Sequence, residues 1–160
     1  MNMGGRVKYP ESWVAHICNE ETRVFLEKVG VPGETFIFRA RRPDIQPEFV
    51  YVDTQNFTII GDGATSQVFC VAEDGAVVAV NLIDRSVRHV NADVVKFARC
   101  LDYFMDSYPF GSVDVTREEL EVIAGRLMAE LMNIDHTVSD GDAIWEYVVH
   151  DVAIGDYVDE

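Results

Sequence analysis

The spacing of apolar residues changes twice along the 160-residue chain, and this change constrains the fold more than any other feature. Between positions 10 and 33 apolar residues recur every three or four positions, as in short amphipathic helices. Between 34 and 90 they form short runs rich in β-branched and aromatic side chains, which is typical of strands. From 91 to 155 the helical spacing returns. Because the strand block is uninterrupted, the pattern predicts an α+β domain whose mixed or antiparallel sheet is flanked by N-terminal and C-terminal helices.

About six strands are expected in the central block. They are predicted at Thr35–Phe38, Phe49–Asp53, Phe57–Ile60, Gln67–Ala72, Ala76–Leu82 and Val87–Val90. Asp74-Gly75 gives the clearest hairpin signal, because both residue types tolerate the positive φ of a two-residue turn. Gly61-Asp62-Gly63 predicts another chain reversal. Segment 39–47 holds three arginines and two prolines and is expected to be a surface loop or a sheet edge.

Capping residues mark the expected helix boundaries. The Pro-Glu pair at 10–11 suits the start of a first helix, and Asn19 suits the N-cap of a second. Thr116 and Glu119 have the spacing of a capping box at the start of a long C-terminal helix. A last helix is expected to begin near Asp142. These signals place helices on both sides of the strand block.

The length suits one domain over residues 1–160, because a chain of this size buries roughly 70% of the surface that its unfolded form exposes. The longest apolar runs are far shorter than the ~20 residues of a membrane helix. No apolar stretch of the kind found in a secretory signal follows the N-terminus. The cysteines Cys18, Cys70 and Cys100 lie among apolar residues and are expected to be reduced core thiols. Together these features predict a cytoplasmic protein without a membrane partner.

Acidic residues are concentrated towards the C-terminus. The chain carries 13 Lys plus Arg and 28 Asp plus Glu, a net charge of −15. The net charge is 0 over residues 1–50, −4 over 51–110 and −11 over 111–160. Such a field repels nucleic acid and anionic membranes and attracts basic protein surfaces, so direct binding to DNA or RNA is not expected. A purely solubilising role for the acidity is the alternative.

Folding alone does not require so dense a cluster of carboxylates, because like charges repel each other. We therefore predict that the acidic residues of the last third contact a partner. The predicted contact residues are Glu118, Glu119, Glu121, Asp135, Asp140, Asp142, Glu146 and Asp151. The arginines of Arg39–Arg42 are predicted to supply a separate contact.

The sequence contains no motif of a phosphate-binding loop, a dinucleotide-binding turn or a nucleophile elbow. Glu146 and His150 lie four positions apart on the last expected helix, but this spacing more often marks a helical side-chain pair than a metal site. Asp135-His136 is likewise more typical of a turn than of a catalytic dyad. We therefore expect no catalytic residue, cofactor or metal, while a site assembled only in the folded chain stays open.

Glycine turns and apolar positions follow one another in a distinctive order. They are Leu26-x-x-x-Gly30-Val31-Pro32, Ile60-Gly61-Asp62-Gly63, Val71-x-x-Asp74-Gly75-x-Val77, and Val90-Asn91 before a helix with Phe97 and Leu101. This order resembles the SUKH superfamily of bacterial immunity proteins. Towards the C-terminus, Leu131-x-x-Ile134-Asp135, Ile144-Trp145-Glu146 and Gly155 resemble the fourth group of that superfamily. The resemblance spans about residues 20–155, and it departs where Ala92-Asp93 replace the small hydroxyl residues that often follow the asparagine.

The resemblance implies a non-enzymatic protein that binds and neutralises a toxin, commonly a nuclease or a nucleic-acid deaminase, delivered between competing bacteria. A toxin that grips nucleic acid presents a basic cleft, which an acidic protein is suited to cover. A regulatory or scaffolding module without a toxin is the first alternative, and a metal-dependent enzyme using Glu146 and His150 is the second. Both monomer and homodimer stay open, since an exposed edge strand such as Thr35–Phe38 can pair between subunits.

Overall fold

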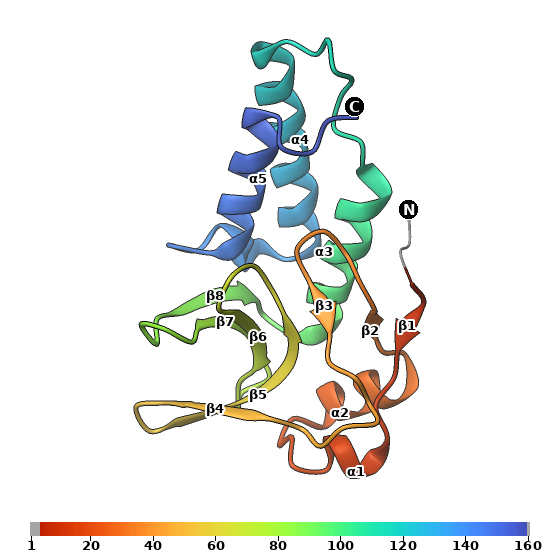
Figure 1. The fold of residues 1–160 in the computed structure, drawn as a ribbon, viewed down its shortest axis with the longest axis vertical. Coiled ribbons are helices and arrows are strands. Elements are labelled where there is room, and N and C mark those ends of the chain that lie inside the picture. Colours follow the sequence, from red (N-terminus) through yellow and green to blue (C-terminus); the bar gives the residue numbers. More distant parts are fainter. Residues whose placement is uncertain (1–3, 160) are drawn as a thin grey trace.

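The computed structural model describes residues 4–159 and combines a strongly curved sheet with a layer of helices (Figure 1). The main sheet contains β3 (Arg39–Ala40), β4 (Phe49–Val52), β5 (Gln55–Asp62), β6 (Gln67–Val71), β7 (Val77–Asn81) and β8 (Val87–Asn91). Its order is β3-β5-β6-β7-β8, and β4 pairs with the first half of β5. Every pairing is antiparallel, so the predicted α+β fold with about six strands is confirmed. A separate two-stranded sheet joins β1 (Arg6–Val7) to β2 (Val31–Pro32).

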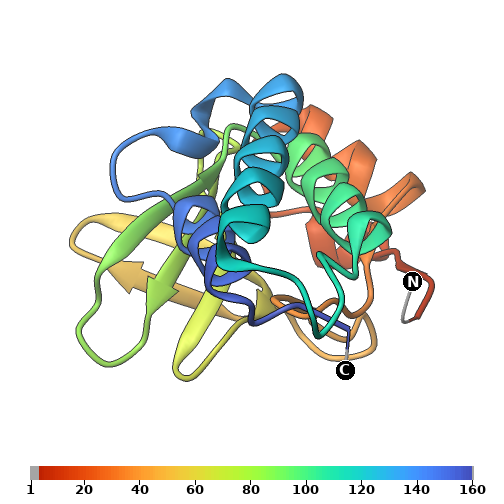
Figure 2. The same ribbon diagram turned by 90° about the horizontal axis from the view of Figure 1, so that it is seen from above.

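The helices form two groups. They are α1 (Glu11–Val14), α2 (Glu20–Lys28), α3 (Val94–Ser107), α4 (Arg117–Ile134) and α5 (Ile144–Ile154), with a 3-10 helix η1 (His136–Ser139) before α5. The helices α3, α4 and α5 lie side by side above the sheet, and α1 and α2 lie at the opposite end of the molecule (Figures 1 and 2). None of the described helices has the length and apolarity needed to cross a membrane.

The predicted caps are present. The side chain of Asn19 accepts a hydrogen bond from the Thr22 N–H at 2.9 Å at the start of α2. Thr116 and Glu119 make both hydrogen bonds of the capping box at the start of α4. Asp93, at the position where the family often has a hydroxyl residue, caps α3 by accepting from the Lys96 N–H at 2.8 Å. Local side-chain chemistry therefore sets these helix starts.

The main core lies between the sheet and the helices. The rings of Phe38, Phe69 and Phe97 meet there with centroids 5.2–5.5 Å apart, joining the loop before β3 to β6 and α3. Trp145 of α5 is completely buried in the same cluster. Such aromatic contacts add to the apolar area that the core removes from water. They fix the position of α3 and α5 over the sheet.

The other face of the sheet carries a second, smaller core. It consists of Val50, Phe57, Ile59, Val68, Cys70, Val78 and Val80. The pairing register shifts between Ile59 and Gly61 and again between Val77 and Val78. Bulges of this kind bend and twist strands. The sheet therefore curls around the second core (Figure 1) and buries these side chains at 8% exposure or less.

The prediction of a strand at Thr35–Phe38 was wrong. The Thr35 hydroxyl accepts from the N–H groups of Ile37 and Phe38, and its own N–H donates to the Phe38 carbonyl at 2.7 Å. These bonds close a tight turn, and the strand consists only of Arg39–Ala40. The edge that we predicted for pairing between subunits is therefore a turn.

Two predicted chain reversals differ in detail from the structure. Gly61 and Asp62 still belong to β5, because they pair with β3 on one side and with β6 on the other; the ring of Phe38 packs onto Gly61 and leaves no room for a Cβ atom there. The hairpin between β6 and β7 is confirmed, but its turn is longer than two residues. The Ala72 N–H bonds to the Ala76 carbonyl, so three residues separate this pair, and Gly75 has the positive φ.

Two of the three cysteines are core residues, as predicted. Cys70 and Cys100 are buried, and this burial raises the pKa of each thiol to about 12. Cys18 is exposed in the loop between α1 and α2, so the prediction of a core thiol was wrong at that position. All three thiols are free.

Candidate functional site

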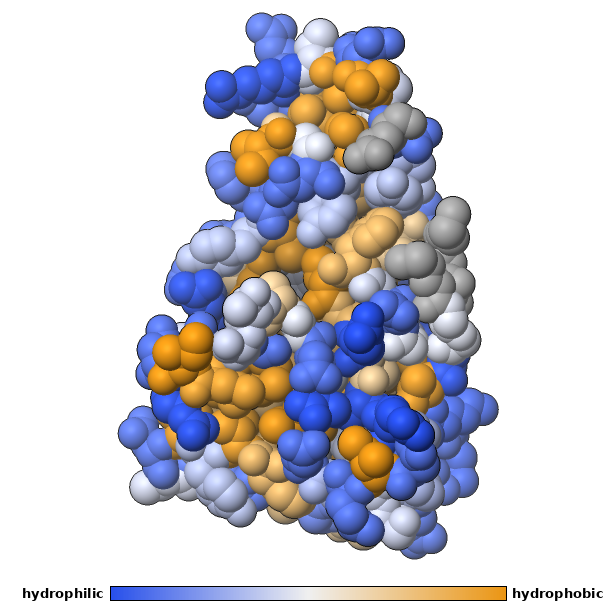
Figure 3. All heavy atoms as spheres, in the orientation of Figure 1, coloured by the Kyte–Doolittle hydropathy of each residue, from blue (hydrophilic) through white to orange (hydrophobic). Residues whose placement is uncertain are grey.

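An open cleft of about 650 Å³ lies between the helical layer and the sheet. One wall consists of α5 and the tail that follows it, and the other consists of segment 34–39 and the turn between β5 and β6. Figure 3 shows the hollow near the middle of the molecule, with apolar atoms at its bottom. A volume of this size is in the range of about 300–1,000 Å³ that is common for binding sites.

The lining of the cleft is largely aromatic and aliphatic. Phe69, Ile144 and Val148 are buried beneath it. Phe36 is 42% exposed, and its ring lies 5.8 Å from the ring of Tyr157, measured between centroids. Phe36 and Tyr157 thus add partly exposed aromatic surface to the apolar lining of the cleft.

Arg88 and Asp142 form an ion pair at the mouth of the cleft, between β8 and the start of α5. The Arg88 Nε lies 3.1 Å from the Asp142 Oδ2. The Arg88 guanidinium also lies 4.7 Å from the centroid of the Tyr147 ring, and the Tyr147 hydroxyl donates to Asp142. The positive charge of Arg88 is thus balanced by groups of this chain.

The arginines of Arg39–Arg42 are balanced in the same way. Arg39 pairs with Glu34 at 2.9 Å, and Arg42 pairs with Asp44 at 2.5 Å. The central arginine, Arg41, bridges Glu48 at 2.8 Å and Asp62 at 2.9 Å. Each guanidinium therefore has a carboxylate beside it, and the separate contact predicted for this segment stays a prediction.

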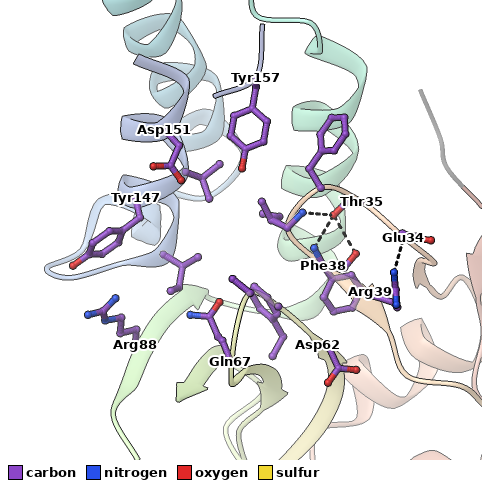
Figure 4. Close-up of a pocket in the computed structure, with 17 residues that line it drawn as sticks. Glu34, Thr35, Phe38, Arg39, Asp62, Gln67, Arg88, Tyr147, Asp151 and Tyr157 are labelled. Atoms are coloured by element: carbon purple, nitrogen blue, oxygen red, sulfur yellow. Dashed lines mark hydrogen bonds and ion pairs between the residues drawn. The ribbon is translucent and has the colours of Figure 1, made fainter. Parts of the chain in front are cut away.

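Asp151 is the carboxylate of the cleft lining that makes no ion pair within the described range 4–159. This half-buried side chain makes no hydrogen bond and no ion pair with a residue of the described range 4–159. Burial, and to a lesser degree the charge of Asp156, raise the pKa of Asp151, and the neighbouring His150 partly opposes them. In Figure 4 its carboxylate and the Tyr157 hydroxyl both point into the cleft from the α5 side, and the Gln67 amide points in from the sheet.

The eight predicted acidic contact residues do not form one surface. The α4–α5 pair is antiparallel, and Gly155 just after α5 lies near Leu120 at the start of α4. The exposed residues therefore fall at opposite ends of this helix pair. Glu118, Glu119 and Glu121 lie at the start of α4, and Asp140, Asp142 and Glu146 lie around the start of α5. Of the remaining two residues, Asp151 lines the cleft and Asp135 is buried.

Asp135 is an interior residue with 1% exposure, so it is not available to a partner in this fold. One carboxylate oxygen accepts from the Asn91 amide at 2.8 Å and from the Ala92 N–H at 2.9 Å. The other accepts from the Thr137 N–H at 3.0 Å and from the Thr137 hydroxyl at 2.7 Å. Burial by itself raises the pKa of Asp135, but these hydrogen bonds outweigh it and lower the pKa below its usual value.

The hydrogen bonds of Asp135 extend into a network that joins three elements. The Trp145 indole N–H of α5 donates to the Asn91 side chain of β8 at 2.9 Å. The His89 ring nitrogen lies 2.7 Å from the Thr137 hydroxyl of η1. Asn91, Asp135 and Trp145 are also among the residues that carry the sequence resemblance. Those positions therefore build the junction of sheet and helices.

The structure gives the metal alternative no support among the described residues. Glu146 and His150 are both exposed on α5. Within residues 4–159 there is no group of three or more His, Cys, Asp or Glu side chains placed to hold one metal ion.

Sequence reasoning found only Asp151 among the residues that line the cleft, apart from the general prediction for the arginine segment. The lining comes from segments that are far apart in the chain, including residues 34–39, 62–69 and 144–157. The aromatic residue Phe36 is the one local feature of the sequence that could have pointed to this cleft. Its segment was assigned to a strand, so Phe36 was not considered as a binding residue.

The fold and the cleft together define an acidic α+β protein with an open, partly aromatic groove, a class of surface suited to binding another molecule. The model of the SUKH-4 immunity protein family matches residues 4–151, almost the whole chain. The chain therefore belongs to the SUKH-4 immunity protein family, which confirms the resemblance seen in the sequence. Membership implies an immunity role with a toxin as partner. No curated protein and no solved structure gives a significant match.

Proposed function

We propose that this protein protects the cytoplasm of a bacterium by binding a toxin that acts on nucleic acid, and that it neutralises the toxin without catalysing a reaction. The observation that carries the proposal is the family match over residues 4–151. The acidity of the chain supports the choice of toxin class. Residues 111–160 contain 13 acidic and 2 basic residues, and a protein that grips nucleic acid presents the opposite charge.

The electrostatic part of this proposal depends on exposed carboxylates. Glu118 and Glu121 lie at one end of the α4–α5 pair, and Asp140 and Glu146 lie at the other. Charges of this kind on the rim of an interface raise the rate of association with a basic partner and contribute less to the lifetime of the complex. The two ends are therefore two candidate regions for the first approach of the toxin.

Co-expression tests the function. Cells that produce the C-terminal domain of the toxin encoded beside this gene are expected to stop growing, and production of this protein is expected to restore growth. The isolated complex is expected to associate more slowly as the salt concentration rises, because ions screen the attraction. Binding without restored growth contradicts the proposal and favours a regulatory or scaffolding role.

Charge reversal separates the two acidic ends. The double variant Asp140→Lys with Glu146→Lys is compared with the matched double variant Glu118→Lys with Glu121→Lys. Reversal at the end that faces the toxin is expected to slow association several-fold, with little change in thermal stability because all four side chains are exposed and the one ion pair lost, Glu121 with Arg117, is exposed as well. Asp142 is left unchanged because it holds Arg88. If neither double variant changes the association rate, the acidic ends do not guide binding.

A further inference from the structure

The charged groups that line the cleft between α5 and segment 34–39 are not all paired, and the proposed function does not explain why. Its arginines Arg39 and Arg88 are each paired with a carboxylate of this chain. Its half-buried carboxylate Asp151 has no such partner among residues 4–159. A carboxylate that is partly removed from water without a hydrogen-bond donor or a cation loses solvation and gains nothing in return. A ligand that supplies a cation removes this cost.

We propose that the cleft binds a segment of the toxin in which a lysine or arginine stands next to an apolar residue, with the basic side chain at Asp151 and the apolar one over Phe69, Ile144 and Val148. This inference rests on the proposed function, because it assumes that the partner is a protein toxin. It adds which part of the molecule receives the partner and which side-chain chemistry is recognised.

The charges of the cleft favour a cationic group over an anionic one. An anion at Arg39 or Arg88 would have to replace Glu34 or Asp142, at the cost of an existing ion pair. A cation at Asp151 breaks no ion pair of the described residues. It also relieves the repulsion between Asp151 and Asp156, whose charges work against each other at the end of α5. The net charge of −15 attracts the same kind of group from a distance.

The aromatic wall suits the stem of a basic side chain. The rings of Phe36 and Tyr157 lie 5.8 Å apart at the α5 end of the cleft, and Phe36 is 42% exposed. Burial and the nearby charges of Asp151 and Asp156 raise the pKa of Tyr157, so its hydroxyl keeps its proton at neutral pH. A lysine or arginine chain lying along these rings gains apolar contact and a cation–π interaction while its charged end reaches Asp151.

The remaining lining suits an uncharged neighbour. Phe69, Ile144 and Val148 form an apolar surface beneath the open side of the cleft, and the Gln67 amide points towards it (Figure 4). An apolar side chain on this surface is removed from water, and the amide of Gln67 is placed to bond to a backbone group of the same segment. The combination of one charge, one apolar surface and one amide fits a stretch of polypeptide.

The first test uses a peptide as the probe. The full chain, labelled for NMR, is titrated with acetyl-Gly-Lys-Leu-Gly-amide and with the neutral counterpart in which norleucine replaces lysine. We expect the lysine peptide to shift the resonances of segment 34–39 and of α5 from Tyr147 to Asp151, and to bind more tightly than the norleucine peptide. Equal binding of the two peptides, shifts elsewhere, or no shifts at the highest soluble concentration would overturn the proposal.

Two variants with matched controls locate the binding. Asp151→Asn is expected to weaken the lysine peptide about ten-fold, as the loss of a charge-assisted hydrogen bond does, while the exposed control Asp53→Asn, between β4 and β5 and outside the cleft, leaves binding unchanged. Ala64→Trp places a large ring in the cleft from an exposed position, and Ala129→Trp places one on the outer face of α4. Only the first tryptophan is expected to block the peptide. Blocking by neither tryptophan would also contradict the proposed site.

The toxin complex separates a failure of this inference from a failure of the proposed function. The same variants are measured against the toxin domain that the wild-type protein neutralises in the co-expression assay. If Asp151→Asn and Ala64→Trp both bind and neutralise the toxin like the wild type, the cleft inference is wrong and the proposed function stands. If the wild type binds the lysine peptide in the cleft but neutralises no toxin, the proposed function is wrong.

Discussion

Asp135 follows the end of α4 and Asp151 lies in the last turn of α5; both belong to the same acidic stretch of sequence, yet they occupy opposite environments. The carboxylate of Asp135 accepts four hydrogen bonds in the interior, and their combined effect lowers its pKa. The carboxylate of Asp151 has no donor among residues 4–159, and burial raises its pKa. The comparison shows that the donors around a carboxylate decide its role, whereas the acidity of its sequence neighbourhood does not.

The two environments have opposite energetic consequences. A buried and fully hydrogen-bonded charge stabilises the fold, and removing it leaves its donors unpaired. A half-buried charge without a donor reduces stability slightly and is available to a ligand. The region around Asp135 therefore has a structural role, whereas the carboxylate of Asp151 can still accept hydrogen bonds from a ligand. Four variants and conditions test this contrast.

The largest effect is expected from Asp135→Ala. The substitution leaves the amide of Asn91, the N–H of Ala92 and both donors of Thr137 without their acceptor. We expect a loss of about 3 kcal/mol in the free energy of unfolding, in line with the breaking of a buried charged network. Chemical denaturation measures it. The exposed control Asp140→Ala is expected to stay within about 0.5 kcal/mol of the wild type, and equal losses in the two variants would remove the contrast.

The next effect is expected from Trp145→Phe. Phenylalanine keeps most of the buried ring but loses the indole N–H, so the Asn91 side-chain oxygen loses its donor at 2.9 Å. The unpaired buried acceptor costs about 1–2 kcal/mol, and the cavity left by the smaller ring at this completely buried position adds to that loss. Tyr147→Phe removes a hydroxyl from a half-exposed ring two residues further along α5 and is the matched control. A similar loss of stability in the control would show that the hydrogen bond from Trp145 to Asn91 contributes no more than an exposed one.

The contrast also explains which parts of the molecule were predictable. The caps at Asn19 and Thr116 and the β6–β7 hairpin depend on residues close in sequence, and they were predicted correctly. Thr35–Phe38 has the composition of a strand, but the Thr35 hydroxyl closes a turn there. The extension of β5 through Gly61 depends on its pairing with Ala40 of β3, which lies more than twenty positions away. A local side-chain hydrogen bond therefore decided the first place, and strand pairing between distant residues decided the second.

The sequence showed that acidic residues are concentrated in the last third of the chain, but it could not show how they are arranged on the surface. Asp135 was predicted to be a contact residue because it belongs to the dense acidic segment of the last third of the chain. Its donors Asn91 and Ala92 lie at the end of a strand more than forty positions earlier. The sequence around Asp135 does not predict these contacts. The cleft of Asp151 was missed for the same reason, because its walls meet only in the folded chain.

A smaller effect is expected from pH. The pKa of Asp135 is lowered in the folded state, so its contribution to stability is fully present above the ordinary pKa of an aspartate, near 4, and is lost as the pH falls through the folded value. The free energy of unfolding is therefore expected to fall less between pH 6 and pH 3 in Asp135→Asn than in the wild type. Denaturation curves at both pH values give the difference. Identical slopes would mean that the Asp135 charge does not stabilise the fold.

The smallest effect on stability is expected from Asp151→Asn. Its comparison with Asp135→Ala is therefore the most informative test of the contrast between the two aspartates. The pKa of Asp151 is raised in the folded state, so its charged form is the less favoured one there, and stability is lost as the pH rises through the ordinary aspartate pKa towards the folded value. The asparagine has no charge to desolvate. The thermal transition at pH 7 is therefore expected to stay unchanged or to rise slightly, while Asp135→Ala lowers it. A marked fall in Asp151→Asn would show that the Asp151 carboxylate has a structural partner, and the distinction between the two aspartates would fail.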